Sequence, residues 1–358
     1  MAKIKILVVD DSAFFRQSIA EILRTHSKFD VIGTAPNGSE AIRFISKTLP
    51  DVITLDLEMP TMDGFTFLRW LMAAHSIPVV VISSHSEGQD VLKALELGAF
   101  DFAVKPSDRA SMDFMKLKAE LIAKVETAAA IPSGQYHAKH AARLRAGVAA
   151  QPLLTGPPAS FPVPPPDAPK VVAIGASTGG PPAVQTIITQ LPKYFPAAVV
   201  VAQHMPPGFT LHFAERLNKA SSVPVREATA GARLEPGSVY ISPGGHHMLF
   251  RKVTNGAEIV LKPRIESDKH SPSVDQMMVS ISDLYGSQVL GVILTGMGSD
   301  GKIGIRTIKN KGGTTIAESE ETCVVFGMPK EAIETGSVDA ILPLDKIPGE
   351  ILRRCLSP

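Results

Sequence analysis

The 358-residue sequence has little cysteine, no long apolar run and almost no net charge. Its two cysteines, Cys323 and Cys355, lie far apart without disulfide-framework or zinc-ligand spacing, which fits packing thiols in a reducing cytoplasm. No apolar run approaches the about 18 residues that span a bilayer, so we expect no direct membrane insertion. Lys and Arg number 36 against 35 Asp and Glu, and this balance argues against general nucleic-acid binding.

Composition divides the chain into two α/β units. At 44% apolar and 20% charged residues, the chain is long enough for two packed cores. In the first unit, residues 1–126, short apolar runs alternate with amphipathic stretches, which predicts a doubly wound parallel sheet. The runs are residues 4–9, 31–35, 52–55, 79–82 and 102–104.

Residues 127–168 are the predicted linker. Alanine, glycine and basic residues come first, and eight of the 18 residues 152–169 are proline. Because such a tract is stiff and extended, we interpret it as a spacer; a proline-rich ligand for a peptide-binding domain is the alternative. Residues 138–150 have the composition of a weak helix.

The second unit, residues 169–358, again alternates strand-like and helix-like segments, as in a Rossmann-like parallel sheet. Strands are expected near residues 171–174, 199–203, 288–294 and 314–317. Helices are expected near residues 181–190, 210–219, 273–284 and 302–311. Residues 225–261 contain shorter strand-like pieces and Pro-Gly turns, which predict a small antiparallel hairpin.

Polar side chains follow the strands of the first unit at their carboxyl ends. They are Asp10 and Asp11, Asp56, Ser83 and Lys105. Because the carboxyl ends of parallel strands meet in one crevice, the three carboxylates should crowd together, and Mg²⁺ prefers such oxygen ligands. An acidic pocket with a lysine and a hydroxyl suits phosphoryl transfer, with one carboxylate as nucleophile. Strand-end caps and a solvated lysine would explain any one of these residues, but not five at matching positions.

Residues 3–125 resemble the receiver domain of two-component response regulators, which has a flavodoxin-like fold. The motifs are VVDDS at 8–12, DLEMPTMDG at 56–64, VISS at 81–84 and VKP at 104–106. The resemblance implies that Asp56 accepts a phosphoryl group and that Asp11 and Asp56 bind Mg²⁺ with help from Asp10. It assigns the remaining site positions to Ser83, Lys105 and, for the switch aromatic, Phe102. It also implies a cis bond before Pro106.

The second unit contains a nucleophile-elbow pattern. Residues 171–181, VVAIGASTGGP, predict a buried strand, a tight turn and a helix, with Ser177 as candidate nucleophile. His204 follows the next strand, and Asp300 lies in a loop after a later one. Hydroxyl, imidazole and carboxylate would thus meet at one sheet edge, which predicts a Ser-His-Asp hydrolase. The order Ser, His, Asp differs from that of α/β-hydrolases, so a different connectivity is implied.

Other residues compete for these roles. His246 and His247 follow a Pro-Gly-Gly turn, so each is an alternative base or a loop residue. His270 precedes Pro272 and is an alternative base or a residue that lines the site entrance. The pattern Gly296-x-Gly298-x-x-Gly301, followed by Glu318, matches a dinucleotide fingerprint. Asp300 argues against that reading, because it places a carboxylate where a pyrophosphate approaches the helix. The same glycines would let backbone N–H groups approach an oxyanion.

Residues 170–356 resemble the catalytic domain of chemotaxis protein-glutamate methylesterases. The matching stretches are IGASTGGP at 174–181, VAQHMP at 201–206, HSPSVD at 270–275 and LTGMGSDG at 294–301. The resemblance implies that Ser177 is the nucleophile, His204 the general base and Asp300 its orienting carboxylate. It further implies that the backbone N–H of Met297 donates to the oxyanion. The long Pro-rich linker is the main departure from the family pattern.

The two resemblances together imply a phosphorylation-regulated enzyme of the chemotaxis system. It would hydrolyse γ-glutamyl methyl esters on the cytoplasmic helices of chemoreceptors and deamidate receptor glutamines. A chemotaxis histidine kinase would phosphorylate Asp56, with Mg²⁺ needed there and no cofactor for ester hydrolysis, and phosphorylation would uncover the catalytic crevice. A DNA-binding output is disfavoured by the second α/β unit; a binding module without catalysis is the other alternative.

Overall fold

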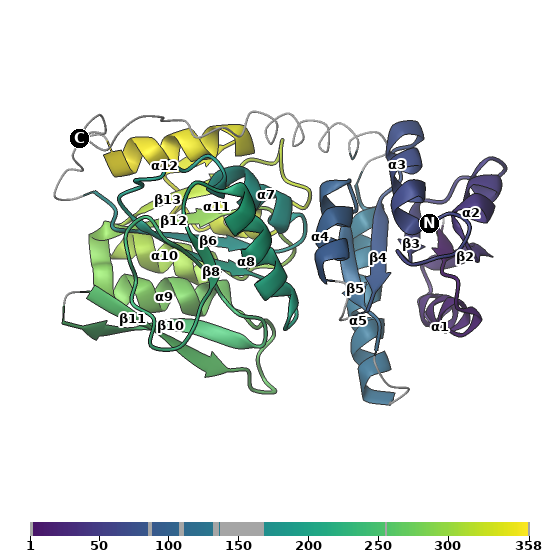
Figure 1. Cartoon of the computed structure of the whole chain (residues 1–358), viewed down its shortest axis with the longest axis horizontal. Coiled ribbons are helices and arrows are strands. Elements are labelled where there is room, and N and C mark those ends of the chain that lie inside the picture. Colours follow the sequence, from purple (N-terminus) through teal and green to yellow (C-terminus); the bar gives the residue numbers. More distant parts are fainter. Residues whose placement is uncertain are drawn as a thin grey trace. The chain divides into compact units, whose positions relative to one another are not determined.

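The computed structural model describes residues 3–84, 88–106, 111–131, 136, 168–254 and 256–356. The chain forms two compact units, Met1–His140 and Ala141–Pro358, each built around a parallel sheet (Figure 1). The proline tract and the helix expected at 138–150 lie outside the described residues.

The first unit contains a five-stranded parallel sheet in the order β2-β1-β3-β4-β5. Its strands are β1 (Ile4–Val9), β2 (Phe29–Ala35), β3 (Val52–Leu55), β4 (Val79–Ser83) and β5 (Asp101–Val104). The central strands are buried on both faces, which explains why they are continuous apolar runs in the sequence. The strand order reverses between β1 and β3, and such a reversal opens a crevice at the carboxyl ends of the strands.

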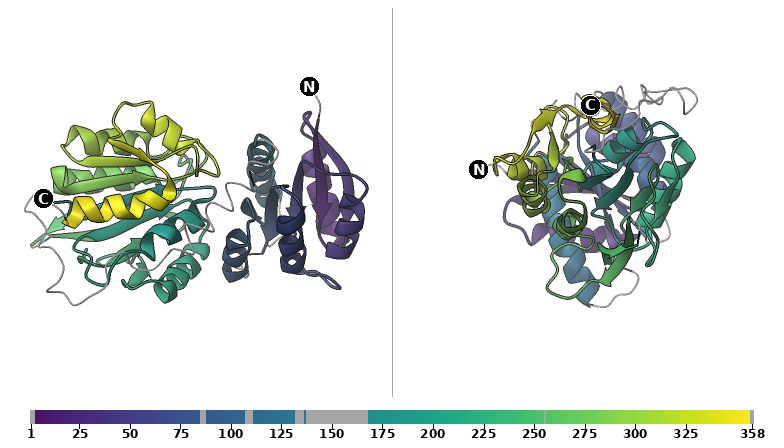
Figure 2. Two further views of the ribbon diagram at one scale, coloured as in Figure 1. Left: turned by 90° about the horizontal axis from the view of Figure 1, so that it is seen from above. Right: turned by 90° about the vertical axis from the view of Figure 1, so that its left-hand side faces the viewer.

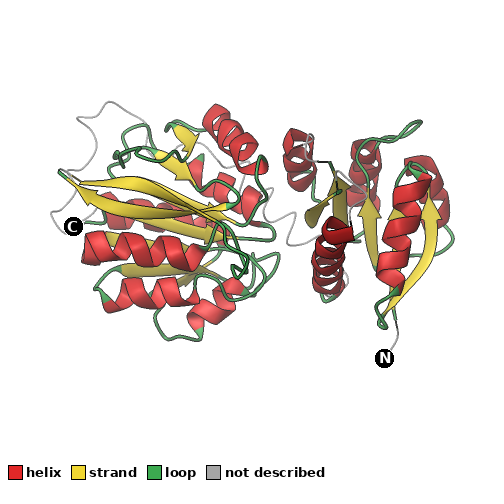
Figure 3. Cartoon of the chain, turned by 90° about the horizontal axis from the view of Figure 1, so that it is seen from below, coloured by secondary structure: helices red, strands yellow, loops and turns green. Residues whose placement is uncertain are grey.

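Helices cover both faces of this sheet (Figure 3). They are α1 (Ala13–Arg24), α2 (Gly38–Ile45), α3 (Gly64–Ala74), α4 (Gly88–Glu96) and α5 (Ser111–Ala129). The first three begin at polar N-caps, Ser12, Asn37 and Asp63, whose side chains accept a backbone N–H three residues on. These caps fix where the chain turns from each strand-end loop into its helix.

The second unit has a seven-stranded sheet in the order β14-β13-β12-β6-β7-β9-β8, and all pairs are parallel. The strands are β6 (Val171–Ala176), β7 (Ala198–Gln203), β8 (Val225–Glu227), β9 (Val239–Ile241), β12 (Val289–Ile293), β13 (Thr314–Glu318) and β14 (Ala340–Leu342). The order reverses beside β6, so a second crevice is expected at the carboxyl ends of β6 and its neighbours.

The expected antiparallel hairpin is present and occupies the second half of the segment predicted to contain it. It consists of β10 (His246–Val253) and β11 (Gly256–Pro263), whereas the earlier pieces β8 and β9 join the main sheet as parallel strands. The prediction of a small hairpin within residues 225–261 is therefore confirmed, whereas the parallel pairing of the earlier pieces was not predicted. A strand of three residues is too short for its hydrophobic pattern to indicate its partner.

The helices of this unit also form two layers, as Figures 1 and 2 show. On one side α7 (Gly180–Ile188) packs beside α8 (Phe209–Ala220) and α12 (Ile347–Leu356). On the other side α10 (Lys302–Asn310) packs between α9 (Val274–Tyr285) and α11 (Met328–Ile333), and the hairpin covers α9. No helix in the described part of the chain is long and apolar enough to cross a membrane.

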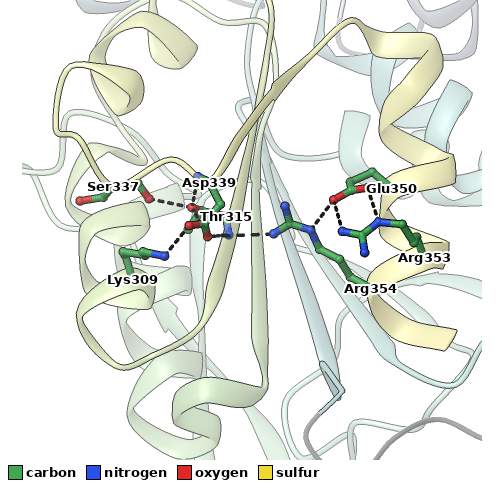
Figure 4. A network of polar contacts seen from close by, with 7 residues as sticks. All are labelled: Lys309, Thr315, Ser337, Asp339, Glu350, Arg353 and Arg354. Atoms are coloured by element: carbon green, nitrogen blue, oxygen red, sulfur yellow. Dashed lines mark hydrogen bonds and ion pairs between the residues drawn. The ribbon is translucent and has the colours of Figure 1, made fainter. Parts of the chain in front are cut away.

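A polar network fastens α12 and α10 to the amino end of β13 (Figure 4). Asp339 accepts the backbone N–H of Thr315 at 2.9 Å and forms ion pairs with Lys309 and, at 4.0 Å, with Arg354. Arg354 also pairs with Glu350 at 2.7 Å. This network lies at the sheet edge opposite the carboxyl ends of the strands, so we assign it a structural role.

Candidate functional site

An acidic pocket lies where the strand order of the first unit reverses. Asp10 follows β1 and Asp56 follows β3, the neighbouring strand; both are buried, whereas Asp11 is exposed. One oxygen from each of the three carboxylates lies within 4.8 Å of the others. These hard oxygen donors converge as ligands of one cation do, so the three residues fit Mg²⁺.

Lys105 compensates the buried carboxylates of this pocket. Its Nζ lies 2.6 Å from Oδ2 of Asp56 and 3.0 Å from Oδ2 of Asp10. Burial nevertheless raises the pKa of Asp56 to about 6, because loss of water disfavours the charged form more than Lys105 favours it.

The cis bond expected before Pro106 is wrong. Among the described residues, the cis peptide bond is the one between Ser271 and Pro272. The bond before Pro106 is trans, the isomer that X–Pro bonds intrinsically favour by about 0.5–1 kcal/mol.

Ser83 and Phe102, the two other residues expected in the receiver site, are both buried. Ser83 ends β4, and Phe102 lies in the neighbouring strand β5. Nζ of Lys124, on α5, lies 5.1 Å from the centre of the Phe102 ring and 3.3 Å from Oδ1 of Asp101. Ser83 therefore lies at the carboxyl end of its strand, on the side of the acidic residues, whereas the ring of Phe102 is buried near α5.

In the second unit, Ser177 stands at a sharp turn between β6 and α7. The strand is buried along its whole length, and Gly179, with φ +73°, is the left-handed N-cap that permits the turn. The backbone N–H of Ser177 donates to the carbonyl of Thr295 at 3.1 Å, which fastens the turn to the loop after β12. This strand–turn–helix context is the one a nucleophile elbow requires.

His204 follows β7, the strand next to β6. Ala176 and Gln203 are register partners at the ends of these strands, so Ser177 and His204 occupy the next two positions. The backbone N–H of His204 donates to the carbonyl of Ala176 at 3.0 Å. The side-chain amide of Gln203 donates to the carbonyls of Ser177 at 2.9 Å and His204 at 3.2 Å, and so joins the two strand ends.

Asp300 reaches His204 from the loop after β12. Its Oδ2 lies 2.8 Å from Nε2 of His204. The Ser273 hydroxyl and the backbone N–H groups of Val274 and Asp275 donate to the same carboxylate at 2.7–3.1 Å. Burial alone would raise the pKa of Asp300, but His204 and these donors lower it to about 2. Asp300 is therefore ionised at neutral pH and can orient the imidazole.

One alternative histidine lies beside this group and two lie in the hairpin. The ring of His270 stacks on that of His204, with centroids 4.2 Å apart. Burial, and next the charge of His204, lower the pKa of His270. His246 and His247 belong to β10, and Nε2 of buried His247 lies 2.9 Å from Oδ2 of Asp268, which favours a structural role.

The glycine loop after β12 runs against Ser177. A Cβ on Gly296 would lie 2.8 Å from Cβ of Ser177, so the two backbones are in close contact. Met297 follows with a side chain that is 39% exposed, and Gly298 has φ +89°. Close approach of backbone to nucleophile is what an oxyanion donor needs.

Comparison with known families agrees with this arrangement. The family model described as CheB methylesterase matches residues 172–351, and that of the response regulator receiver domain matches residues 6–115. The chain belongs to the CheB methylesterase family. Membership in this family, with a receiver domain ahead of the CheB domain, confirms both resemblances drawn from the sequence.

Individual members of the CheB family match over nearly the whole chain. A protein-glutamate methylesterase/protein-glutamine glutaminase of Geobacter sulfurreducens is 47% identical over 375 residues, covering 99% of this chain and 98% of that protein. One of Myxococcus xanthus is 44% identical and covers 96% and 95%. The crystal structure of the Thermotoga maritima CheB methylesterase catalytic domain covers 52% of this chain and 98% of that chain, with 47% identity and a TM-score of 0.50. The predicted α/β fold class is thereby confirmed.

In the CheB domain, the groups at the glycine loop that would bind a dinucleotide already have partners within the protein. Glu318, which a fingerprint would direct at a ribose, is fully buried and accepts the N–H of Thr295 at 2.8 Å. The N–H groups of Gly301 and Gly304, at the start of α10, donate to Asp275. The helix N-terminus is thus occupied by the protein's own carboxylate, and the dinucleotide reading is wrong.

Three residues that hold the candidate site together have no role in the sequence-based prediction. Gln203 joins two strand ends, and Ser273 and Asp275 surround Asp300 and the start of α10. The spacing Ser273-x-x-Gln276 is a signal for a helix start, and Ser273 is indeed the N-cap of α9. No pattern in the sequence indicates that Asp275 would cap a different helix.

Proposed function

We propose that this CheB-family chain is a phosphorylation-regulated carboxylic ester hydrolase that acts on γ-glutamyl methyl esters of chemoreceptors and deamidates receptor glutamines. The names of its relatives support the two substrates. The observation that carries the hydrolytic mechanism is the 2.8 Å contact between Nε2 of His204 and Oδ2 of Asp300, beside Ser177 at the next strand end.

Ser177, His204 and Asp300 have distinct roles in the proposed reaction. Since Nε2 of His204 donates its proton toward ionised Asp300, Nδ1 is the ring nitrogen left to accept a proton. Nδ1 takes the proton of the Ser177 hydroxyl as Oγ attacks the ester carbonyl. Asp300 holds the required tautomer and stabilises the imidazolium that forms. The backbone N–H of Met297 donates to the oxyanion.

The tetrahedral intermediate collapses to an acyl-enzyme, which is then hydrolysed. The imidazolium of His204 returns its proton to the leaving methoxide, so methanol departs and the glutamyl acyl group stays on Ser177. A water molecule, deprotonated by His204, attacks this acyl group, and His204 then returns the proton to Oγ of Ser177 as glutamate is released. With a glutamine substrate the leaving group is ammonia, and the acyl group and its hydrolysis are the same.

The receiver unit would supply the regulation. Asp56 would accept a phosphoryl group from a chemotaxis histidine kinase, with Lys105 holding a phosphoryl oxygen and Ser83 at the end of the neighbouring strand β4. Mg²⁺ bound by Asp10, Asp11 and Asp56 would neutralise charge on the phosphoryl group. A shift of a few kcal/mol between a restrained and an active state is enough to regulate the hydrolase.

The decisive experiment measures methanol release from methylated receptor by the full chain, with and without a small phosphodonor and Mg²⁺. Ser177→Ala should lower turnover by at least about 1,000-fold, because it removes the hydroxyl of the proposed nucleophile. Asp56→Asn should lose stimulation by the phosphodonor. Turnover retained by Ser177→Ala would remove Ser177 from the mechanism, and equal stimulation of Asp56→Asn would remove Asp56.

A receiver-linked binding module without catalysis is the competing function. A serine-directed fluorophosphonate probe separates the two. Covalent labelling of the parent chain that is lost in Ser177→Ala supports the enzyme, whereas a parent chain that is not labelled supports the binding module.

A further inference from the structure

Asp300 and Asp275 exchange hydrogen bonds between the starts of two helices. Asp300, just before α10, accepts from the start of α9, and Asp275, within α9, accepts from the start of α10. Asp300 precedes α10 in the chain, yet its carboxylate accepts from the first turn of α9. Val274 N–H donates to Oδ2 at 2.7 Å, and Asp275 N–H donates to Oδ1 at 2.9 Å. These bonds fix Asp300 relative to α9, not to its own loop.

Asp275 makes the opposite connection. It lies in the first turn of α9, but its Oδ1 accepts the N–H of Gly301 at 2.9 Å and that of Gly304 at 2.7 Å, both at the start of α10. Gly301, directly after Asp300, has φ +101° and serves as the N-cap of α10 without any side chain to satisfy the exposed N–H groups. The carboxylate of Asp275 takes the place of that missing cap.

This exchange brings two carboxylates together, which by itself is unfavourable. Burial, with the charge of Asp300 as a further contribution, raises the pKa of Asp275 to about 6. The cap of α9 does not need Asp300, because the Ser273 hydroxyl already accepts the N–H of Gln276 at 3.3 Å. A purely structural cap for α10 could also come from a serine or asparagine at the N-cap. The arrangement therefore suits alignment of Asp300 better than it suits capping alone.

We propose that Asp275 is a positioning residue for the proposed Ser-His-Asp group: by bonding Gly301 and Gly304 it fixes the α10 loop to α9, and so keeps Asp300 directed at Nε2 of His204. This inference rests on the proposed function. It assigns the effect to the position of Oδ1, which accepts the N–H groups of Gly301 and Gly304; the backbone N–H of Ile303 also donates to this carboxylate. The negative charge of Asp275 is not required.

A matched pair of variants separates position from charge. Asp275→Asn keeps an oxygen that can accept both N–H groups but removes the charge; Asp275→Glu keeps the charge but moves the oxygen by one methylene. We expect kcat within about threefold of the parent for Asn and a fall of about 10- to 100-fold for Glu, with KM nearly unchanged in both. The kcat of Asp275→Ala should fall at least as far as that of Asp275→Glu. The second-order rate of Ser177 labelling by a fluorophosphonate should follow kcat.

Asp283→Ala provides the control on the same two helices. Asp283 lies in α9 and pairs with Lys311, just after α10, at 2.6 Å, so this variant also removes a link between the helices. It is expected to keep kcat within twofold, because this exposed pair lies at the far end of α9.

The order of the kcat values of Asp275→Asn and Asp275→Glu decides whether the proposal holds. A lower kcat for Asp275→Asn than for Asp275→Glu would show that the charge of Asp275 matters and the position of its oxygen does not. A kcat within twofold of the parent for Asp275→Asn, Asp275→Glu and Asp275→Ala would show that neither matters. Each result overturns the proposal. Ser177→Ala, assayed alongside, keeps the two proposals separate. If Ser177→Ala is inactive while Asp275 variants are unimpaired, only the role of Asp275 is lost; if Ser177→Ala still turns over substrate, the proposed function fails.

Discussion

The imidazole rings of His204 and His270 lie parallel, with their centroids 4.2 Å apart and their planes 4° from each other. His204 is thus held at two points, by Asp300 at Nε2 and by a flat ring against its face. Because the pKa of His270 is lowered, its ring is neutral at pH 7 and does not repel an imidazolium on His204. The stack therefore supports both the orientation of the base and its protonated form.

Replacement of His270 should test this support. Aromatic stacking contributes about 0.5–1.5 kcal/mol, so His270→Ala should lower kcat by about 2- to 12-fold at pH 7.5. His270→Phe keeps a flat ring and should recover most of that loss. Methanol release under saturating substrate measures both variants; a Phe variant as slow as the Ala variant would contradict a role for the stack.

Gly296→Ala should disable the site without unfolding the domain. The added Cβ would overlap Sδ of buried Met328 and lie 2.8 Å from Cβ of Ser177 and 3.1 Å from its backbone nitrogen, so the Met328 side chain and the elbow or the loop must shift. We expect kcat to fall by about 100-fold, since a shift of about 1 Å at reacting groups has that effect. Gly349→Ala, whose Cβ has nothing within 4 Å, is the control and should keep full activity. Equal rates for the two variants would show that the loop tolerates the contact.

The stability of the second unit should depend on pH through Asp275. Burial raises its pKa from 3.8 to about 6, so the folded state binds this proton more tightly than the unfolded state does. The resulting stabilisation is complete below about pH 4 and is lost as the pH rises through about 6. Asp275→Asn cannot ionise and should gain about 1–3 kcal/mol of unfolding free energy relative to the parent between pH 4 and pH 7.

Thermal unfolding of the full chain at a series of pH values measures this difference. The melting temperature of Asp275→Asn minus that of the parent should increase with pH. A difference that stays constant from pH 4 to pH 7, or that decreases, would mean that the proton on Asp275 is not linked to folding. Asp283→Asn, on the same helix, is the control.

Much of the fold follows from local sequence patterns. The runs at residues 4–9 and 52–55 are strands with those bounds, because buried stretches of parallel strands are mainly apolar; β3 is buried throughout and β1 from Ile6 to Val9. By contrast, β8 and β14 have three residues each, and their places at opposite edges of the seven-stranded sheet depend on partners distant in the sequence. Local patterns carry no information about such pairing.

The residues of the candidate site also fall into two groups, those predicted from the sequence and those found only in the structure. Ser177, His204 and Asp300 were predicted to meet because each follows a strand, and their positions at neighbouring strand ends, with Asp300 bonded to His204, agree with that expectation. The contacts of Asp275 were not predicted. For His270 a place at the site entrance was predicted, but not the stacking of its ring on that of His204. Both residues belong to a segment that no strand end places, so only tertiary contacts bring them to the site.

The sequence by itself determined which chemical groups are available and which sheet edge they occupy, because strand ends and tight glycine turns are written in short local patterns. The tertiary structure alone decided how those groups are aligned. Hydrogen bonds exchanged between the starts of α9 and α10, and a ring stacked on His204, join residues far apart in the chain, and such contacts exist only once the helices have packed.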